Sequence, residues 1–238
     1  MHERFKEIKM DVKTKLMILD KMYQIYDNMA CKTDLACKTH CSTCCTRNVT
    51  MTSLEGHRIL EYMISGNKTP VLKKLKAESE KKRFIPEITT NTLAAMCAKG
   101  DDPPDEDIDQ LWGACPFLQD NLCAVYEARP FGCRCFTSKT DCSVNGYAEV
   151  DPFDMTVNHL FLQYIEHIDA NGYYGNLTDM VQYITMIENQ ASEDKTRKNK
   201  IKKTLLKNQP ISTLMIPQEH KEKIQPVIHA LNNINMPK

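Results

Sequence analysis

Closely spaced cysteines are the residues of this chain that could do chemistry. Four of the eleven cysteines, Cys37, Cys41, Cys44 and Cys45, fall within nine positions. Thiolates are soft ligands, and clustered cysteines are typical of zinc and iron sites. If this segment were helical, Cys37, Cys41 and Cys44 would share one face, while Cys45 would point about 100° away from Cys44. We therefore expect either that a helix ends here or that Cys44 and Cys45 serve different metal ions.

A second group of cysteines follows in a segment without helical periodicity. Its members are Cys115, Cys123, Cys133, Cys135 and Cys142. A structureless stretch as long as residues 113 to 152 is unusual inside a compact domain unless something else orders it. Bound metal would supply that order. We predict that the two cysteine blocks are joined in one metal site or in two.

Side chains beside the second block could tune a thiolate centre. Arg129 and Arg134 carry positive charge next to the cysteines, which favours thiolates and offsets the charge of ligated sulfur. Tyr126 could donate a hydrogen bond to a ligating sulfur, or could simply pack as a partly buried side chain. These three are the predicted cofactor-binding residues, and no catalytic residue is assigned.

The pattern resembles the YkgJ-type cysteine-cluster family, which is described as zinc- or iron-chelating. The resemblance rests on the CxxxCxxCC block and on the later segments C-P-F-L, C-x-x-Y-E and R-P-x-x-C-R. It implies eight metal ligands, which are Cys37, Cys41, Cys44, Cys45, Cys115, Cys123, Cys133 and Cys142. Cys135 competes with Cys142 for the eighth place. The resemblance implies metal binding and no particular reaction.

Other residues leave the ligand set open. Cys31 and Cys97 are additions to the family pattern, and a small buried hydrophobic side chain is the favoured interpretation of Cys97. His40 lies inside the first block and could replace one thiol. Eight thiolates could close two Zn²⁺ sites or hold one or two [4Fe-4S] clusters. The second block lacks a CxxC pair, which favours iron-sulfur slightly over zinc.

Two enzyme classes share parts of this pattern. Radical S-adenosylmethionine enzymes have the spacing of Cys37, Cys41 and Cys44, but this chain has Thr43 where they place an aromatic residue, and no two adjacent glycines. The flagellin lysine N-methylase group has a cysteine cluster of this kind, so S-adenosylmethionine-dependent methyl transfer is an alternative by analogy. Whether the protein is an enzyme stays open.

Composition gives no sign of a membrane or nucleic-acid protein. Thirty-one Lys and Arg balance thirty-one Asp and Glu, and no stretch approaches the roughly 18 apolar residues of a membrane span. The first residues lack the apolar stretch of a secretory signal, so we expect a cytoplasmic protein. In that reducing compartment, clustered cysteines are more often metal ligands or redox groups than disulfides.

One stretch departs from this balance. Residues 195 to 207 hold seven basic side chains and no acidic one. A solvated helix face is the favoured interpretation; the alternative is a zinc-stabilised interaction module whose basic helix contacts an acidic partner or nucleic acid. The expected partners are a metal ion or cluster and a protein redox or assembly partner, without a membrane and with nucleic acid less favoured.

Hydrophobic periodicity predicts a mainly α fold: a helical domain with an irregular, metal-ordered cysteine-rich loop segment. Thr52-Ser-Leu-Glu55 has the form of a capping box, residues 48–51 could be extended, and residues 171–176 read as a turn. The predicted helices cover residues 4–29, 52–65, 71–84, 87–98, 154–168, 177–188, the basic run, and 218–231 with a break at Pro226.

Two units are predicted along the chain. Residues 1–152 form a cysteine-cluster metal-binding domain with an N-terminal helix, and residues 153–238 form a C-terminal helical region packed on it. The expected function is coordination of an iron-sulfur cluster or zinc through two cysteine blocks, in electron transfer or as the metal centre of an enzyme.

Overall fold

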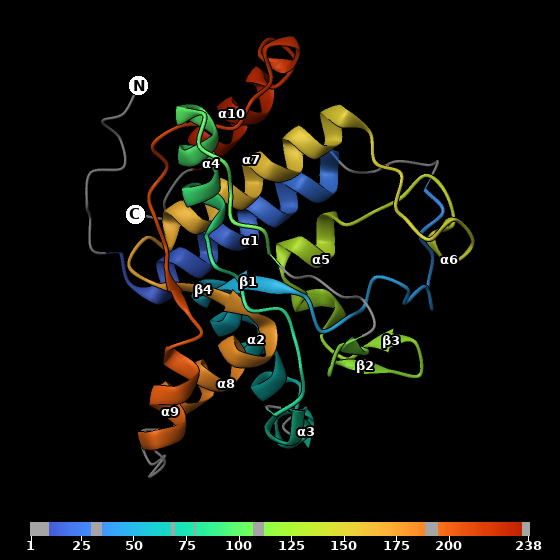
Figure 1. Cartoon of the computed structure of the whole chain (residues 1–238), viewed down its shortest axis with the longest axis vertical. Coiled ribbons are helices and arrows are strands. Elements are labelled where there is room, and N and C mark those ends of the chain that lie inside the picture. Colours follow the sequence, from blue (N-terminus) through green and yellow to red (C-terminus); the bar gives the residue numbers. More distant parts are fainter. Residues whose placement is uncertain are drawn as a thin grey trace.

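The computed structural model of the chain describes residues 10–29, 35–67, 70–78, 80–106, 112–188 and 195–234. Within these residues it contains ten α-helices, a three-stranded antiparallel sheet and a two-stranded hairpin (Figure 1). The predominance of helix is therefore confirmed, while the class is mixed α/β because small sheets join the helices. None of the helices in these ranges has both the length and the apolar character needed to cross a membrane.

Most predicted helices are present, with shifted ends. α2 begins with the predicted capping box, in which Thr52 Oγ1 accepts from the Glu55 N–H and Glu55 accepts from the Thr52 N–H. Residues 4–9 of the first predicted helix lie outside the described ranges. The helices are α1 (Val12–Met29), α2 (Ser53–Ser65), α3 (Pro70–Glu78), α4 (Thr90–Lys99), α5 (Phe131–Cys135), α6 (Cys142–Asn145), α7 (Pro152–Ile168), α8 (Leu177–Glu188), α9 (Lys195–Lys202) and α10 (Gln225–Asn232).

The turn predicted over residues 171–176 is present only at Asn171 and Gly172, because Tyr173–Asn176 is β4, the central strand of the larger sheet. Its antiparallel neighbours are β1 (Thr50–Thr52) and β5 (Leu206–Lys207). The glycine that suggested a turn permits a close approach instead: a Cβ on Gly175 would lie 2.5 Å from Leu205 Cδ2. β1 and β4 come from the two predicted units, whose boundary stays a prediction.

Two clusters of buried apolar side chains form the core. The first joins α1, α7 and α10 to α5. Its centre is aromatic: the Phe131 ring stacks on Phe161 at 5.2 Å between centroids and meets Tyr26 edge-on at 4.8 Å. The second cluster joins α2, α3, α8 and α9, and it includes Phe117, Val125 and Ala128 from the cysteine-rich segment.

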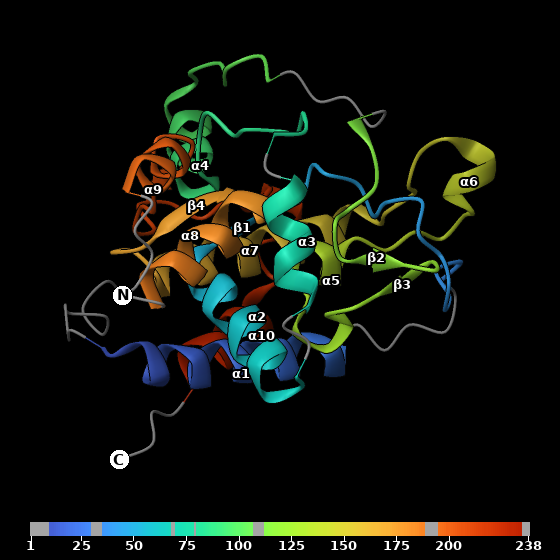
Figure 2. The ribbon, with the colours of Figure 1, turned by 90° about the horizontal axis from the view of Figure 1, so that it is seen from below.

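The cysteine-rich segment lies on one side of the molecule. It is not wholly irregular, since it holds the hairpin β2 (Leu118–Gln119) and β3 (Leu122–Cys123), the 3₁₀ turn η2 (Tyr126–Ala128), α5 and α6. Figures 1 and 2 show α6 and the hairpin beside residues 35–49 and far from α9. The two cysteine blocks therefore meet on the same side of the core.

Candidate metal centre

The end of the first cysteine block is bound to the start of the second. The Cys115 N–H donates to Cys45 O at 2.8 Å, and the Arg47 N–H donates to Gly113 O at 3.0 Å. Thr46 and Ala114 form a β-bridge between these two hydrogen bonds. This short antiparallel pairing places Cys45 directly beside Cys115.

The start of the first block is bound elsewhere. The Ala36 N–H donates to Ser138 O at 2.9 Å, which places Cys37 near the loop that leads to Cys142. Between the two anchors the block runs through turns, with His40 in the left-handed region at a φ of 69°. It is therefore not a helix. Its cysteines are spread between two parts of the second block instead of sharing a helical face.

We call Cys45, Cys115, Cys123 and Cys133 the inner thiol group. The Cys45 thiol lies close enough to the other three to interact with them electrostatically. Burial raises the pKa of Cys133 well above its ordinary value, and the neighbouring thiols of Cys115 and Cys123 raise it further. Cys115 and Cys123 also pack against the second core cluster. Sequence-distant thiols thus meet at the edge of the core.

Local structure positions each member of this group. Cys123 lies in β3 opposite Leu118, and the hairpin turns at Asp120 and Asn121, both with positive φ. Such a two-residue turn suits Asn and Asp, which tolerate left-handed backbone. Cys133 lies on α5, where its N–H donates to Pro130 O at 3.0 Å.

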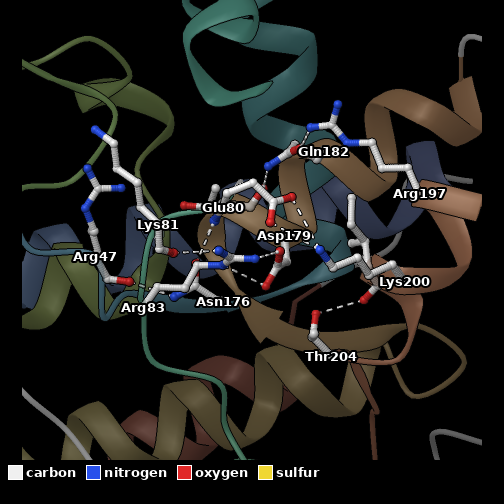
Figure 3. A network of polar contacts seen from close by, with 12 residues as sticks. Arg47, Glu80, Lys81, Arg83, Asn176, Asp179, Gln182, Arg197, Lys200 and Thr204 are labelled. Atoms are coloured by element: carbon white, nitrogen blue, oxygen red, sulfur yellow. Dashed lines mark hydrogen bonds and ion pairs between the residues drawn. The ribbon is translucent and has the colours of Figure 1, made fainter. Parts of the chain in front are cut away.

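Arg47 anchors the inner group to the rest of the fold. Its side chain forms an ion pair with Glu78 at the end of α3, and both side chains are nearly buried. Its carbonyl accepts from Asn176 Nδ2 at 2.7 Å (Figure 3). A Cβ on Gly113, which has a φ of +109°, would lie 3.0 Å from Arg47 Nε. Glycine at this position therefore allows both the backbone turn and the close passage of the arginine.

We call Cys37, Cys41, Cys44 and Cys142 the outer thiol group. Burial raises the pKa of Cys37, and the nearby thiols of the other three raise it as well. Cys142 begins α6, whose N-cap Asp141 accepts from the Ser143 N–H at 2.9 Å. Cys41 and Cys44 are exposed, so this group lies nearer the solvent than the inner one.

The adjacent residues Cys44 and Cys45 connect the two groups. The Cys44 thiol donates a hydrogen bond to Cys45, which lowers the pKa of Cys45 and raises that of Cys44. Cys44 also interacts electrostatically with both Cys37 and Cys133. It therefore stands between the two groups, while Cys45 lies within the inner one.

Three other candidates are assigned to neither group, although Cys135 also interacts electrostatically with Cys133. Cys135 is buried in the first core cluster, its Sγ lies 3.6 Å from Gly132 O, and burial raises its pKa to about 12. Cys97 on α4 is exposed, so its interpretation as a buried hydrophobic residue is wrong. His40 is exposed within the first block. Cys31 lies outside the described residues.

The predicted cofactor-binding residues contact the protein itself. Arg129 donates to Tyr126 O at 2.7 Å and lies over the exposed Tyr126 ring at 3.8 Å. Arg134 pairs with Asp27 of α1 at 2.9 Å and lies over the Tyr23 ring at 4.5 Å. Arg134 Nε is buried and has no hydrogen-bond partner among the described residues. The Arg134 Nε–H on α5, the helix that carries Cys133, is therefore available to donate a hydrogen bond.

The donor chemistry of the two groups suits a thiophilic metal. All ten cysteines in the described ranges are free thiols. Burial and mutual proximity disfavour several thiolates at once, and a bound cation would offset that charge. The thiols lie near one another but do not form a complete coordination shell. In the ranges described, no three His, Cys, Asp or Glu side chains are already arranged to hold a metal ion.

Sequence reasoning missed the features that hold the groups in place. The hairpin turn had a signal, because Asp120-Asn121 stands between two leucine-containing strands. The ion pair of Arg47 with Glu78 and the pairing around Thr46 and Ala114 had none, because they join residues far apart in the sequence.

Comparison with known proteins agrees with this chemistry. Neither the curated proteins nor the solved structures that were compared contain a match to this chain. The model of the CxxCxxCC family, described as "Putative zinc- or iron-chelating domain", matches residues 36–151. That range begins at the residue bound to Ser138, and it includes both thiol groups. The similarity of this chain to the CxxCxxCC family therefore covers residues 36–151.

Proposed function

We propose that the chain binds a thiophilic metal, zinc or iron-sulfur, in two centres of four cysteines each. The inner thiol group holds one centre and the outer thiol group holds the other. The observation that carries this proposal is the pair of backbone anchors, at Cys45 with Cys115 and at Ala36 with Ser138, which divide the first block between two parts of the second.

The chemistry of such centres follows from their ligands. Four thiolates satisfy the tetrahedral preference of Zn²⁺ and equally the four corners of a [4Fe-4S] cluster. Bound metal would keep the cysteines deprotonated and would order the loops that carry them. The buried Arg134 Nε could donate to a ligated sulfur, which is a known means of tuning such a centre.

The outer centre suits exchange with a protein partner. Cys41 and Cys44 are exposed, so a bound metal there would lie near the surface, where an electron or a metal ion could pass to another protein. We propose this role for the outer centre. The inner centre, packed against the core, would be less accessible to a partner.

The basic helix α9 is less well suited to a second function. Arg197 contacts Gln182, and Lys200 pairs with Glu80 at 3.2 Å (Figure 3). Lys207, beyond the helix, lies over the Tyr173 ring at 3.9 Å. These side chains contact the protein's own surface, which favours the solvated-face interpretation over an interaction module.

The proposal is tested on protein purified without oxygen, by analysis of metal and acid-labile sulfide and by absorption spectroscopy. Iron with sulfide and a broad visible band identifies iron-sulfur, and colourless zinc identifies zinc. We expect Cys115→Ser and Cys142→Ser each to remove the metal of one centre, and the double variant to remove all of it. Cys97→Ser, an exposed thiol in neither group, is the matched control. A folded wild-type protein without metal, or complete loss in either single variant, would contradict the proposal.

A further inference from the structure

A buried carboxylate on α2 lies beneath the helix that carries Cys133. Glu55 is 3% exposed, and its two carboxylate oxygens accept four hydrogen bonds. Oε2 accepts from the N–H of Thr52 at 2.8 Å and from its hydroxyl at 2.9 Å. The bond from the Thr52 N–H belongs to the capping box of α2, and the hydroxyl bond joins the same two residues. The hydrogen bonds of Oε1 come from α5 and α1, so helix capping does not explain them.

Oε1 connects α2 to α5 and to α1. It accepts from the Phe131 N–H at 2.7 Å and from the Tyr23 hydroxyl at 3.1 Å. Phe131 is the first residue of α5 and precedes Cys133 by two positions. Pro130 before it supplies no side-chain cap, so the carboxylate of a different helix satisfies this buried N–H.

Tyr23 extends the connection to the other end of α5. Its hydroxyl donates to Glu55, and its ring lies under the Arg134 guanidinium at 4.5 Å. Arg134 in turn pairs with Asp27, also on α1. Phe131 and Arg134, on either side of Cys133, are thus both held in place by contacts with Glu55 and Tyr23.

We propose that Glu55 is a positioning residue for the inner thiol group: its carboxylate fixes α5 against α2 and α1, and thereby fixes the Cys133 sulfur among its partner thiols. The inference deepens the proposed function and rests on it for the meaning of that group. Glu55 acts through the Phe131 N–H and Tyr23 and is not itself assigned as a metal ligand.

Glutamine cannot replace this carboxylate. Its amide has one accepting oxygen and one donating NH₂, so Glu55→Gln sets an NH₂ against either the Thr52 N–H or the Phe131 N–H. A buried donor facing another donor loses its hydrogen bond and its solvation together. Either arrangement loosens one of the two elements that the carboxylate joins.

The chain offers a matched control in Glu166 on α7. This carboxylate is 1% exposed and also accepts from backbone N–H groups of distant elements, Asn91 at 2.7 Å and Gln209 at 2.7 Å. It joins α7 to α4 and to residue 209, which hold no member of either thiol group. Glu166→Gln thus makes the same chemical change in a buried network away from the inner group.

The test is pulsed alkylation of the full-length protein as purified, with each cysteine quantified by mass spectrometry, with and without a chelator. In Glu55→Gln we expect the alkylation rate of Cys133 to rise about tenfold, as the loss of a buried hydrogen bond implies. Cys37 and Cys142 should react as in the wild type. In Glu166→Gln, Cys133 should also react as in the wild type.

Equal reactivity of Cys133 in Glu55→Gln and the wild type would overturn the inference, as would a uniform rise at all cysteines. If Glu55→Gln fails to fold, Tyr23→Phe removes one of the four hydrogen bonds and should raise Cys133 reactivity about threefold, while no selective rise would again overturn it. The two proposals fail separately: a wild type without metal refutes the metal centres, and unselective alkylation refutes the role of Glu55.

Discussion

The two thiol groups differ in what holds them in place. Around the inner group, Phe117 and Phe131 are completely buried in the two core clusters. Around α6 in the outer group, the large apolar side chains face solvent: Val144 is 80% exposed and Tyr147 is 65% exposed. Apolar burial therefore positions the inner group, while the outer group depends on a few backbone hydrogen bonds and on any metal that it binds.

This difference implies unequal dependence on metal. Burying a phenylalanine contributes about 1.5–3 kcal/mol of stability, so the inner segment has a source of order that needs no ligand. The outer segment has little comparable burial, so the proposed metal coordination would have to offset its conformational entropy. The eight cysteines can thus form one centre whose surroundings are ordered by apolar burial and one whose surroundings are ordered by the bound metal.

Removal of metal should give the largest effect and should separate the two regions. Structural zinc sites contribute on the order of 10 kcal/mol of apparent binding free energy, all of which is lost on chelation. We expect residues 136–151 to lose amide protection fully, while residues 117–131 keep part of theirs. Hydrogen exchange with mass spectrometry measures both segments, and equal loss in both would remove the distinction.

Phe131→Ala should harm the inner region specifically. It deletes a ring that contacts Tyr26 and Phe161, so we expect the free energy of unfolding to fall by about 3–5 kcal/mol. Phe136→Ala, at a ring 51% exposed, should cost less than about 0.5 kcal/mol. Urea unfolding of both variants provides the comparison. Similar losses of unfolding free energy would show that burial of Phe131 does not specifically stabilise the inner region.

Cys142→Ala and Cys135→Ala should affect different properties. Cys142 belongs to the outer group, so its replacement should reduce the bound metal to that of one centre. Cys135 packs in the core, so its replacement should keep the metal and cost about 1 kcal/mol of stability. Metal analysis with urea unfolding distinguishes them. Metal loss in Cys135→Ala alone would reverse their assignments.

Glu78→Gln should give the smallest effect, and one that depends on pH. Burial alone would raise the pKa of Glu78, but hydrogen bonds from Lys81 and Arg47 lower it below the ordinary 4.5. A lowered carboxyl pKa stabilises the fold above its unfolded value and loses that effect as the pH falls through the folded value. At pH 7 the variant should lose at most about 1 kcal/mol, and below pH 4.5 the difference from wild type should fade.

The matched control for this prediction is Glu80→Gln, which removes an exposed carboxylate paired with Lys200. Its unfolding free energy should stay close to that of the wild type at both pH values. A loss in Glu78→Gln that persists at acid pH would show that the ion pair with Arg47 is not its cause.

The sequence was most informative where structure is local. The capping box at Thr52 and Glu55 and the amphipathic pattern of α1 and α8 were predictable, because side chains three or four positions apart determine them. Tyr173–Asn176 was misread because its glycine, Gly175, allows close packing of the strand against Leu205, a contact between residues distant in the chain.

The candidate site was likewise predictable only where it depends on neighbouring residues. Cysteine spacing indicated metal ligands and left open whether a helix ends at Cys44 or Cys44 and Cys45 serve different metal ions. It could not divide the cysteines into groups, because that division follows from the pairing of Cys45 with Cys115 and of Ala36 with Ser138. The second role of Glu55 was hidden for the same reason, since Phe131 lies on a different helix.

The adjacency of Cys44 and Cys45 has a consequence for how metal would be acquired. Neighbouring Cα atoms are about 3.8 Å apart. The two proposed centres use consecutive residues, so a single peptide unit joins them. The first ion to bind would bear most of the entropic cost of ordering that peptide, and the second would find it already in place. Filling would then be cooperative, and partly loaded molecules would be scarce at intermediate metal concentrations.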